Sequence, residues 1–185
     1  MNKSIEEVEE VIRKVEERDL LEILEIYNQG IEDGLATFEE DLKDENYINN
    51  WFSLHSGRHC AFVATNDQGE VMGWASINPY NSRAAYYGVG ELSIYIHRGF
   101  RGQGIGQQLL HVLEEEAKSQ DFYKLVLSTF PINTLGQGLY RKLNYREVGL
   151  FKNQGRLRGK FVDVMIMEKL LFDQNYYLLN TKESN

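Results

Sequence analysis

The residues best suited to chemistry lie in one stretch, where the apolar, strand-like segment 90–96 runs into a glycine-rich turn. The turn carries Arg98 and Arg101, continues as Gly102-Gln103-Gly104-Ile105-Gly106, and opens an amphipathic segment. Glycines let the backbone approach an anion closely, and several N–H groups can converge on it. The first turn of the following helix adds unpaired N–H groups and the positive end of the helix dipole. The pattern therefore predicts a binding site for a pyrophosphate.

The spacing of these glycines does not fit the two most familiar nucleotide motifs. A dinucleotide fingerprint needs glycine at relative positions one, three and six, and Gln107 stands at the sixth. A Walker loop ends in Gly-Lys followed by Ser or Thr, whereas here Gly106 is followed by two glutamines. The alternative that the residues leave open is a plain glycine-rich turn with incidental arginines.

Composition limits the other kinds of site. The chain has 185 residues and a formal net charge of −8, so we expect one domain and no nucleic-acid partner. Cys60 is the only cysteine and lies in an apolar run, so we expect a core residue and neither a disulfide nor a thiolate zinc site. No serine lies in a Gly-x-Ser-x-Gly elbow. The histidines have no metal-ligand spacing, so we expect no bound metal and assign surface or structural roles to His55, His59, His97 and His111.

No stretch of the chain approaches the apolar length that a membrane span requires. Residues 1–10 are acidic, whereas a signal peptide would be basic and then apolar. We therefore expect a cytoplasmic protein that does not interact with membranes.

Hydrophobic periodicity predicts a strand, two helices, three strands, a helix, a strand, a helix and two strands. The first helix should begin at Asp19, in a capping-box pattern with Glu22, and end near Gly30, which suits a left-handed stop. The other expected helices span residues 44–55, 105–117 and 134–143. The expected strands span residues 12–15, 60–65, 71–77, 90–96, 124–129, 145–151 and 161–167.

The spacing Arg101-x-x-Gly104-x-Gly106 resembles the coenzyme A motif of the GNAT acetyltransferase superfamily, whose order of elements is also the order above. Other segments resemble its branch acting on phosphinothricin, methionine sulfoximine and arsinothricin: 27–31, 36–39, 51–52, 73–76, 91–96, 133–145 and 161–163. The resemblance implies a single domain over residues 1–185, with a core of about 12–171. It implies an α/β fold with a mixed, mostly antiparallel sheet and helices on both faces.

Three residues depart from the pattern of that branch. Gly136 replaces a serine, so one hydroxyl near the coenzyme is missing, and Phe161 replaces a tryptophan. Asn144 replaces a glycine at an expected helix end, where asparagine is the next best left-handed cap.

The resemblance implies acetyl-CoA as the co-substrate. Its pyrophosphate would lie on the turn formed by Arg101, Gly102, Gln103, Gly104, Ile105 and Gly106. Its pantetheine arm would pair with Ile94, Tyr95 and Ile96 like an added strand and bond to Asn133. A backbone N–H at the splayed end of that strand would stabilise the carbonyl oxygen.

Direct acetyl transfer in a ternary complex also needs a base and an acid. The resemblance assigns the base to Glu91, because an α-amine is mostly protonated at neutral pH. It suggests Tyr140 as the acid that protonates the departing thiolate, although this branch often has histidine there. By residue type alone, Glu91 could be a solvated strand-end charge and Tyr140 a packed helix residue.

The resemblance implies a homodimer and an amino-acid-like acceptor. We expect Arg83 to grip the acceptor carboxylate in a two-bond fork and Phe38 to form an apolar wall. Other acceptors stay open, namely a protein N-terminus, a polyamine or an aminoglycoside, since an acidic chain suits a cation. A non-catalytic module that binds coenzyme A is a further alternative, against which the presence of Glu91 and Tyr140 argues.

Overall fold

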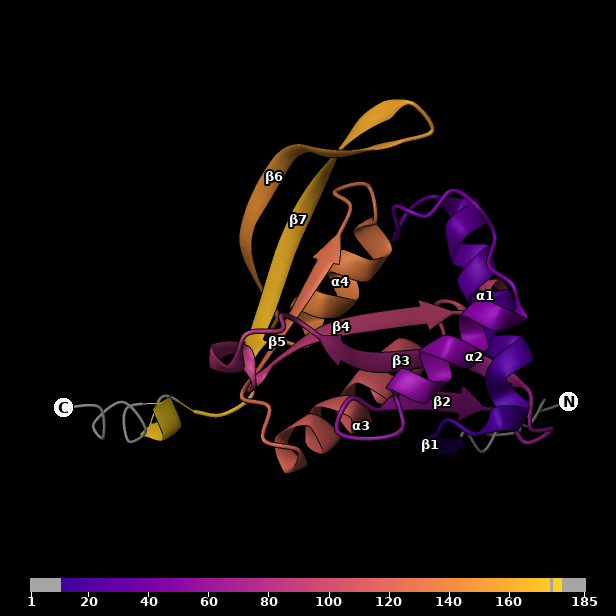
Figure 1. Ribbon diagram of the computed structural model, residues 1–185, viewed down its shortest axis with the longest axis horizontal. Helices are drawn as coiled ribbons and strands as arrows, with labels where there is room; N and C mark the ends of the chain where they lie inside the picture. Colours follow the sequence, from indigo (N-terminus) through magenta and orange to yellow (C-terminus); the bar gives the residue numbers. More distant parts are fainter. Residues whose placement is uncertain (1–10, 174, 178–185) are drawn as a thin grey trace, which may run out of the picture.

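The computed structural model describes residues 11–173 and 175–177, and its sheet has seven strands within them (Figure 1). The strands lie in the order β1-β2-β3-β4-β5-β7-β6, and every neighbouring pair is antiparallel except β4 and β5. Their bounds are β1 Val11–Lys14, β2 Ala61–Thr65, β3 Val71–Pro79, β4 Val89–Ile96, β5 Lys124–Thr129, β6 Arg146–Leu157 and β7 Lys160–Leu170. The mixed, mostly antiparallel sheet expected from the sequence is confirmed.

The helices also follow the expected order. They are α1 Leu20–Asp33, α2 Glu45–Leu54, α3 Ile105–Ser119 and α4 Thr134–Lys142. Asp44 caps α2 by accepting a hydrogen bond from the N–H of Tyr47 at 3.0 Å, which fixes the start of that helix. Asn144 adopts φ +66° just after α4, so its left-handed role is also confirmed.

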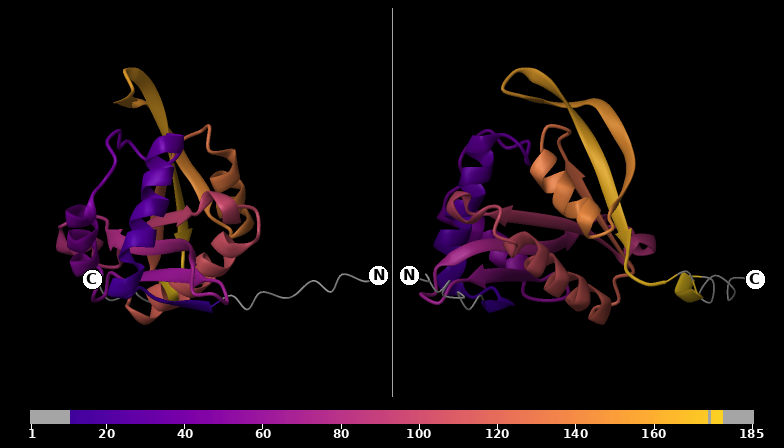
Figure 2. Two further views of the ribbon diagram at one scale, coloured as in Figure 1. Left: turned by 90° about the vertical axis from the view of Figure 1, so that its right-hand side faces the viewer. Right: turned by 180° about the vertical axis from the view of Figure 1, so that it is seen from behind.

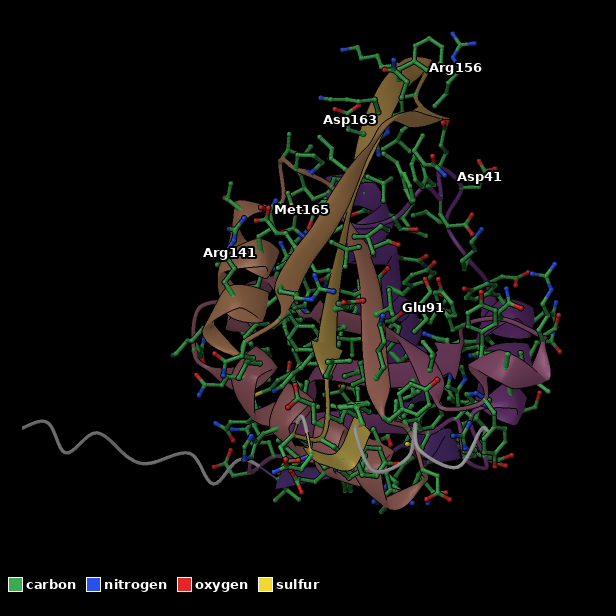
Figure 3. All side chains as sticks on the ribbon, turned by 90° about the vertical axis from the view of Figure 1, so that its left-hand side faces the viewer. Asp41, Glu91, Arg141, Arg156, Asp163 and Met165 are labelled. Carbon is green, nitrogen blue, oxygen red and sulfur yellow. The ribbon has the colours of Figure 1, made fainter. Side chains whose placement is uncertain are left out.

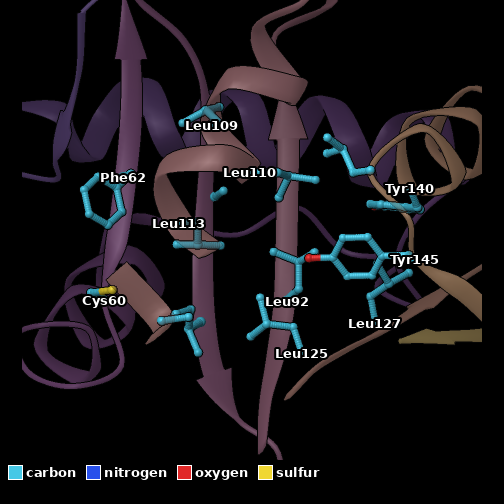
Figure 4. Close-up of a cluster of buried hydrophobic side chains, with 14 of the residues drawn as sticks. Cys60, Phe62, Leu92, Leu109, Leu110, Leu113, Leu125, Leu127, Tyr140 and Tyr145 are labelled. Atoms are coloured by element: carbon cyan, nitrogen blue, oxygen red, sulfur yellow. The ribbon is translucent and has the colours of Figure 1, made fainter. Parts of the chain in front are cut away.

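Helices cover both faces of the sheet. Alternate residues of a strand point to opposite faces, and in β2 and β3 both sets are apolar. Phe62 and Ala75 pack against α3 in the larger core, whereas Val63 and Trp74 pack against α1 and α2 in a second core. Figure 4 shows the larger cluster, with the leucines of α3 facing Leu92 of β4 and Leu125 of β5. The centre of the sheet is therefore buried on both faces.

The parallel pair β4 and β5 is short and opens partway along. Its last register pair is Glu91 with Val126. Beyond that pair, β4 remains bonded only to β3 and β5 only to β7. The two strands thus part in the middle of the sheet and leave two facing backbone edges without strand partners.

The hairpin of β6 and β7 projects well beyond the other strands in every view (Figure 2). Both strands are longer than predicted, since β6 continues to Leu157 instead of ending at residue 151, and β7 covers Lys160–Leu170 instead of residues 161–167. The added part of β6 is mostly exposed to solvent. It therefore lacks the alternation of apolar and polar residues from which a strand is predicted.

The predicted end of the first helix is wrong. α1 continues through Gly30 to Asp33, and the left-handed cap is Gly34 with φ +64°. Gly30 is buried inside the helix, and a Cβ at this position would lie only 2.8 Å from the ring of Tyr95. Its missing side chain therefore allows close approach of α1 to β4 and does not stop the helix. The capping-box reading at Asp19 also changes, because its carboxylate binds Arg13 and the Glu16 N–H instead of capping α1.

We expect Gly30→Ala to destabilise the protein although alanine favours helix. Overpacking against Tyr95 should cost about 1–3 kcal/mol of unfolding free energy. Gly138→Ala is the matched control, because Gly138 lies in α4 with nothing within 4 Å of an added Cβ. Urea denaturation of both variants checks this, and equal behaviour of the two would contradict the close-packing explanation.

Candidate active site

The glycine turn after β4 has the geometry of an anion cradle. The backbone is left-handed at Gly102 and Gly104, with φ of +79° and +90°. Gly104 is the N-cap of α3, a helix of 15 residues, and a Cβ added at either glycine would meet no atom within 4 Å. The turn therefore offers open space in front of the free N–H groups that begin α3, and Ile105 anchors it in the core.

The arginines of the turn hold its backbone in place. Arg101 Nη2 lies 2.7 Å from Asp33 of α1, and its Nε donates to the carbonyl of Ile96. Arg98 pairs with Asp33 and Glu32. Burial raises the pKa of the Asp33 carboxyl, but hydrogen bonds from both arginines hold it below its ordinary value of 3.8. Both guanidinium groups are thus already neutralised, so the cradle relies mainly on backbone N–H groups.

The opening between β4 and β5 ends near this cradle. Backbone groups alternate between the two edges of a strand, and the N–H of His97 donates to Met72 of β3 at 2.9 Å. By that alternation the N–H groups of Ile94 and Ile96 face the opening. A linear ligand held by the cradle could therefore bond to the free edge of β4.

On the α1 and α2 side of the sheet, a cleft of about 460 Å³ reaches the same strand. Aromatic rings form much of its wall, and the polar groups come from β3, β4 and the segment before α2. The residues lining it are Tyr27, Thr37, Glu39, Tyr47, Ile48, Trp51, Trp74, Asn78, Glu91, Ser93 and Tyr95.

Glu91 lies in this cleft at the point where β4 and β5 part. Figure 3 shows it in the body of the sheet, far from the hairpin end marked by Arg156. Its side chain is half-buried, and this burial raises the pKa of the carboxyl above its ordinary value of 4.5. Glu91 forms no ion pair with any of the described residues, whereas Glu39 in the same cleft is paired with Lys43. Glu91 is therefore placed to accept a proton from a ligand.

Tyr140 lies on α4 at the edge of the larger core, 5.9 Å from the ring of Tyr145. It is 8% exposed, and burial raises the pKa of its phenol to about 12. The phenol thus stays protonated at neutral pH and has a proton to donate.

Asn133 is the N-cap of α4. Its Oδ1 accepts from the N–H of Gly136 at 3.0 Å, and its Nδ2 donates to Thr129 at 3.3 Å. A Cβ at Gly136 would lie 2.7 Å from Nδ2 of Asn133. The absence of a side chain at 136 therefore makes room for this cap, which keeps one amide hydrogen of Asn133 available to a ligand.

The two residues expected to contact the acceptor lie outside the cleft lining. Phe38 packs edge-on against Phe130, at 4.9 Å between ring centres, and closely approaches Gly155 of β6. Arg83 is exposed in the segment between β3 and β4, where it precedes the short helical turn Ala84–Tyr86. Within one chain the structure therefore does not bring Arg83 together with Glu91.

Sequence reasoning missed several cleft residues, above all Tyr47, Trp74, Asn78 and Ser93. A signal was present in the alternation of strand residues, because Trp74 and Asn78 share one face of β3, while Glu91, Ser93 and Tyr95 share one face of β4. This alternation alone does not show which residues of the two strands lie side by side. That depends on the register of β3 against β4, which pairs Asn78 with Glu91.

The described residues contain neither a metal-binding cluster nor a membrane-spanning helix. No group of three or more His, Cys, Asp or Glu side chains could hold a metal ion in this part of the chain. No helix in the same residues has the length and apolar character to cross a membrane.

Comparison with known proteins gives consistent matches. The model of the acetyltransferase (GNAT) family matches residues 19–145. The L-methionine sulfoximine/L-methionine sulfone acetyltransferase of Pseudomonas aeruginosa is 30% identical over 158 residues, which cover 85% of this chain and 92% of that protein.

Two solved structures are similar over nearly the whole chain. A phosphinothricin acetyltransferase of Sinorhizobium meliloti in complex with acetyl-CoA has a TM-score of 0.82 at 30% identity, covering 87% of this chain and 88% of that one. A ribosomal-protein-alanine N-acetyltransferase of Brucella melitensis has a TM-score of 0.83 at 32% identity, covering 86% and 99%.

Proposed function

Because this chain belongs to the acetyltransferase (GNAT) family, we propose that it transfers the acetyl group of acetyl-CoA to the amino group of a small, amino-acid-like acceptor. The observation that carries the proposal is Glu91, a half-buried carboxylate facing a cleft on the strand that ends in the glycine cradle. The relatives that act on methionine sulfoximine and phosphinothricin support the class of acceptor.

The residues present fit acetyl-CoA. The open cradle at Gly102 and Gly104 suits its pyrophosphate, because any side chain there would fill the space in front of the α3 N-terminus. The free edge of β4 at Ile94 to Ile96 suits the amide groups of the pantetheine arm. When bound, acetyl-CoA supplies a thioester whose carbonyl can be attacked by an amine.

Two side chains and one backbone group of this protein then have tasks in the transfer. Glu91 takes a proton from the acceptor ammonium, directly or through water, and its raised pKa makes it a stronger base than a solvated glutamate. A backbone N–H on the free edge of β4 stabilises the oxygen that becomes negative. The buried phenol of Tyr140 donates a proton to the thiolate as it leaves.

A cationic acceptor is the second candidate, and the cleft itself favours it. Within the described residues, two carboxylates and several aromatic rings line the cleft, and no arginine or lysine does. Aromatic faces and a carboxylate without an ion pair suit an ammonium group. An amino acid needs a positive partner for its carboxylate, which we propose is Arg83 in a homodimer whose contact region includes residues 81–86.

The coenzyme site is tested by Gly104→Val, which should raise the KM for acetyl-CoA at least about tenfold by filling the phosphate space. Gly69→Val is the matched control, because Gly69 also has a left-handed φ of +83° and open surroundings but lies in the turn between β2 and β3. Steady-state kinetics with thiol detection measure both variants. Similar KM values in the two variants would contradict the assignment of the cradle.

The base is tested by Glu91→Gln, which should lower kcat about 10²–10⁴-fold and leave the KM for acetyl-CoA nearly unchanged. In the wild type, activity should rise as pH increases through the raised pKa of Glu91. The variant should lack that rise and recover partly at high pH, where the amine, with a pKa of about 8, deprotonates itself. Glu39→Gln controls for loss of a cleft carboxylate, and equal losses in both variants would exclude a specific base.

The acceptor class is tested with a panel of phosphinothricin, methionine sulfoximine, a diamine and an alanine-initiated peptide. We expect acetylation of the free amino acid analogues, and Arg83→Ala should weaken it by about 1.5–3 kcal/mol of transition-state binding, since a bond to a charged group is lost. The same variant should leave an amine without a carboxylate unaffected. Turnover restricted to the diamine or the peptide would replace the amino acid analogue by that class.

A further inference from the structure

A buried histidine connects α2 to the floor of the cleft. His55 follows the last residue of α2, is 9% exposed, and stacks on Trp51 with 4.4 Å between ring centres. It does not line the cleft, and the proposed reaction does not use it. A polar ring at this depth needs partners for both nitrogens.

Both partners are present. Nδ1 of His55 lies 2.7 Å from the carbonyl oxygen of Trp51, and Nε2 lies 2.9 Å from Oδ1 of Asn78 on β3. The amide nitrogen of Asn78 donates to the backbone carbonyl of Glu91 at 3.2 Å and to Oγ of Ser93 at 3.0 Å. A continuous chain of hydrogen bonds therefore runs from α2 across β3 to β4.

The orientation of the Asn78 amide follows from its neighbours. The carbonyl of Glu91 can only accept, so the amide nitrogen must face β4 and the amide oxygen must face His55. The carbonyl of Trp51 can also only accept. The bonds to β4 therefore fix the orientation of the Asn78 amide, with its oxygen facing Nε2 of His55.

We propose that His55 and Asn78 are positioning residues for the acetyl transfer, which hold β4 so that the Glu91 carboxylate keeps its place in the cleft. The inference rests on the proposed role of Glu91 as the base. Asn78 and Glu91 form a register pair of β3 and β4, and Glu91 also ends the pairing of β4 with β5. Just beyond it β4 has lost one neighbour, and the amide of Asn78 bonds to β4 on both sides of that point, at the Glu91 carbonyl and at the Ser93 hydroxyl.

A contribution to packing alone is the competing explanation, because His55 also joins α2 to β3. The two explanations differ in what they predict for catalysis. A packing role changes stability and affects every kinetic step alike. A positioning role lowers kcat through Glu91, and it leaves the KM for acetyl-CoA unchanged because the glycine cradle lies at the far end of β4.

The test compares His55→Phe, Asn78→Asp and their double variant, with and without Glu91→Gln. His55→Phe keeps the ring on Trp51 but removes both hydrogen bonds, and Asn78→Asp keeps the volume but places an oxygen against the carbonyl of Glu91. We expect each to lower kcat about tenfold, as small misplacements of a catalytic group do. The double variant should lose no more than either single variant, since both break one chain.

In the Glu91→Gln background, neither substitution should lower kcat further. His55→Gln should restore much of the activity lost in His55→Phe, because its amide can still donate to Asn78. His111→Phe, at an exposed histidine of α3, controls for the substitution itself. Thermal unfolding and the KM for acetyl-CoA show whether each variant is folded.

Two results would overturn the inference while leaving the proposed base intact. One is a lowered melting temperature with unchanged kcat, and the other is the same fold-loss of kcat with and without Glu91. An unchanged kcat in Glu91→Gln alone would contradict the base, and the positioning role would fail with it.

Discussion

The parting of β4 and β5 is the constraint on which the rest of this structure depends. Two parallel strands that stayed paired would leave no backbone edge free in the middle of the sheet. Here the closed end is held tightly, because Gly88, just before β4, lets the ring of Tyr123, just before β5, approach more closely than a side chain would permit: a Cβ there would lie 2.1 Å from that ring. From Glu91 onward the strands diverge, and both the Glu91 carboxylate and the free edge of β4 lie at that point.

The surrounding elements keep the parted strands in place from both sides. α3 packs beneath the sheet in the larger core, and α1 and α2 pack above it around Trp74. The arginines of the glycine turn bind Asp33 at the end of α1, so the turn is fixed to the helix on the cleft side. The cradle and the cleft are therefore held at a set distance by one helix, one strand and the ion pairs between them.

The cleft also limits which acceptor chemistry the chain can support. Its aromatic wall and its carboxylates suit the amino group of an acceptor, and Lys43 neutralises one of the carboxylates. A carboxylate on the acceptor would need a positive group from elsewhere, because Arg83 lies outside the cleft of its own chain. Under the proposed function, the choice between acceptor classes thus depends on residues at the rim or from a second copy, and the cleft residues alone do not decide it.

The amino-acid sequence by itself determined the order of the elements, the glycine cradle and the family, because these follow from local periodicity and from residue types at fixed short spacings. The end of α1 was decided by tertiary structure, since Gly30 is explained only by the ring of Tyr95, far away in sequence. The same holds for the pairing of Arg101 with Asp33 and for the bond chain from His55 to Glu91. These contacts join residues that lie 13 to 68 positions apart, about which local patterns carry no information, and only strand register and helix packing bring them together.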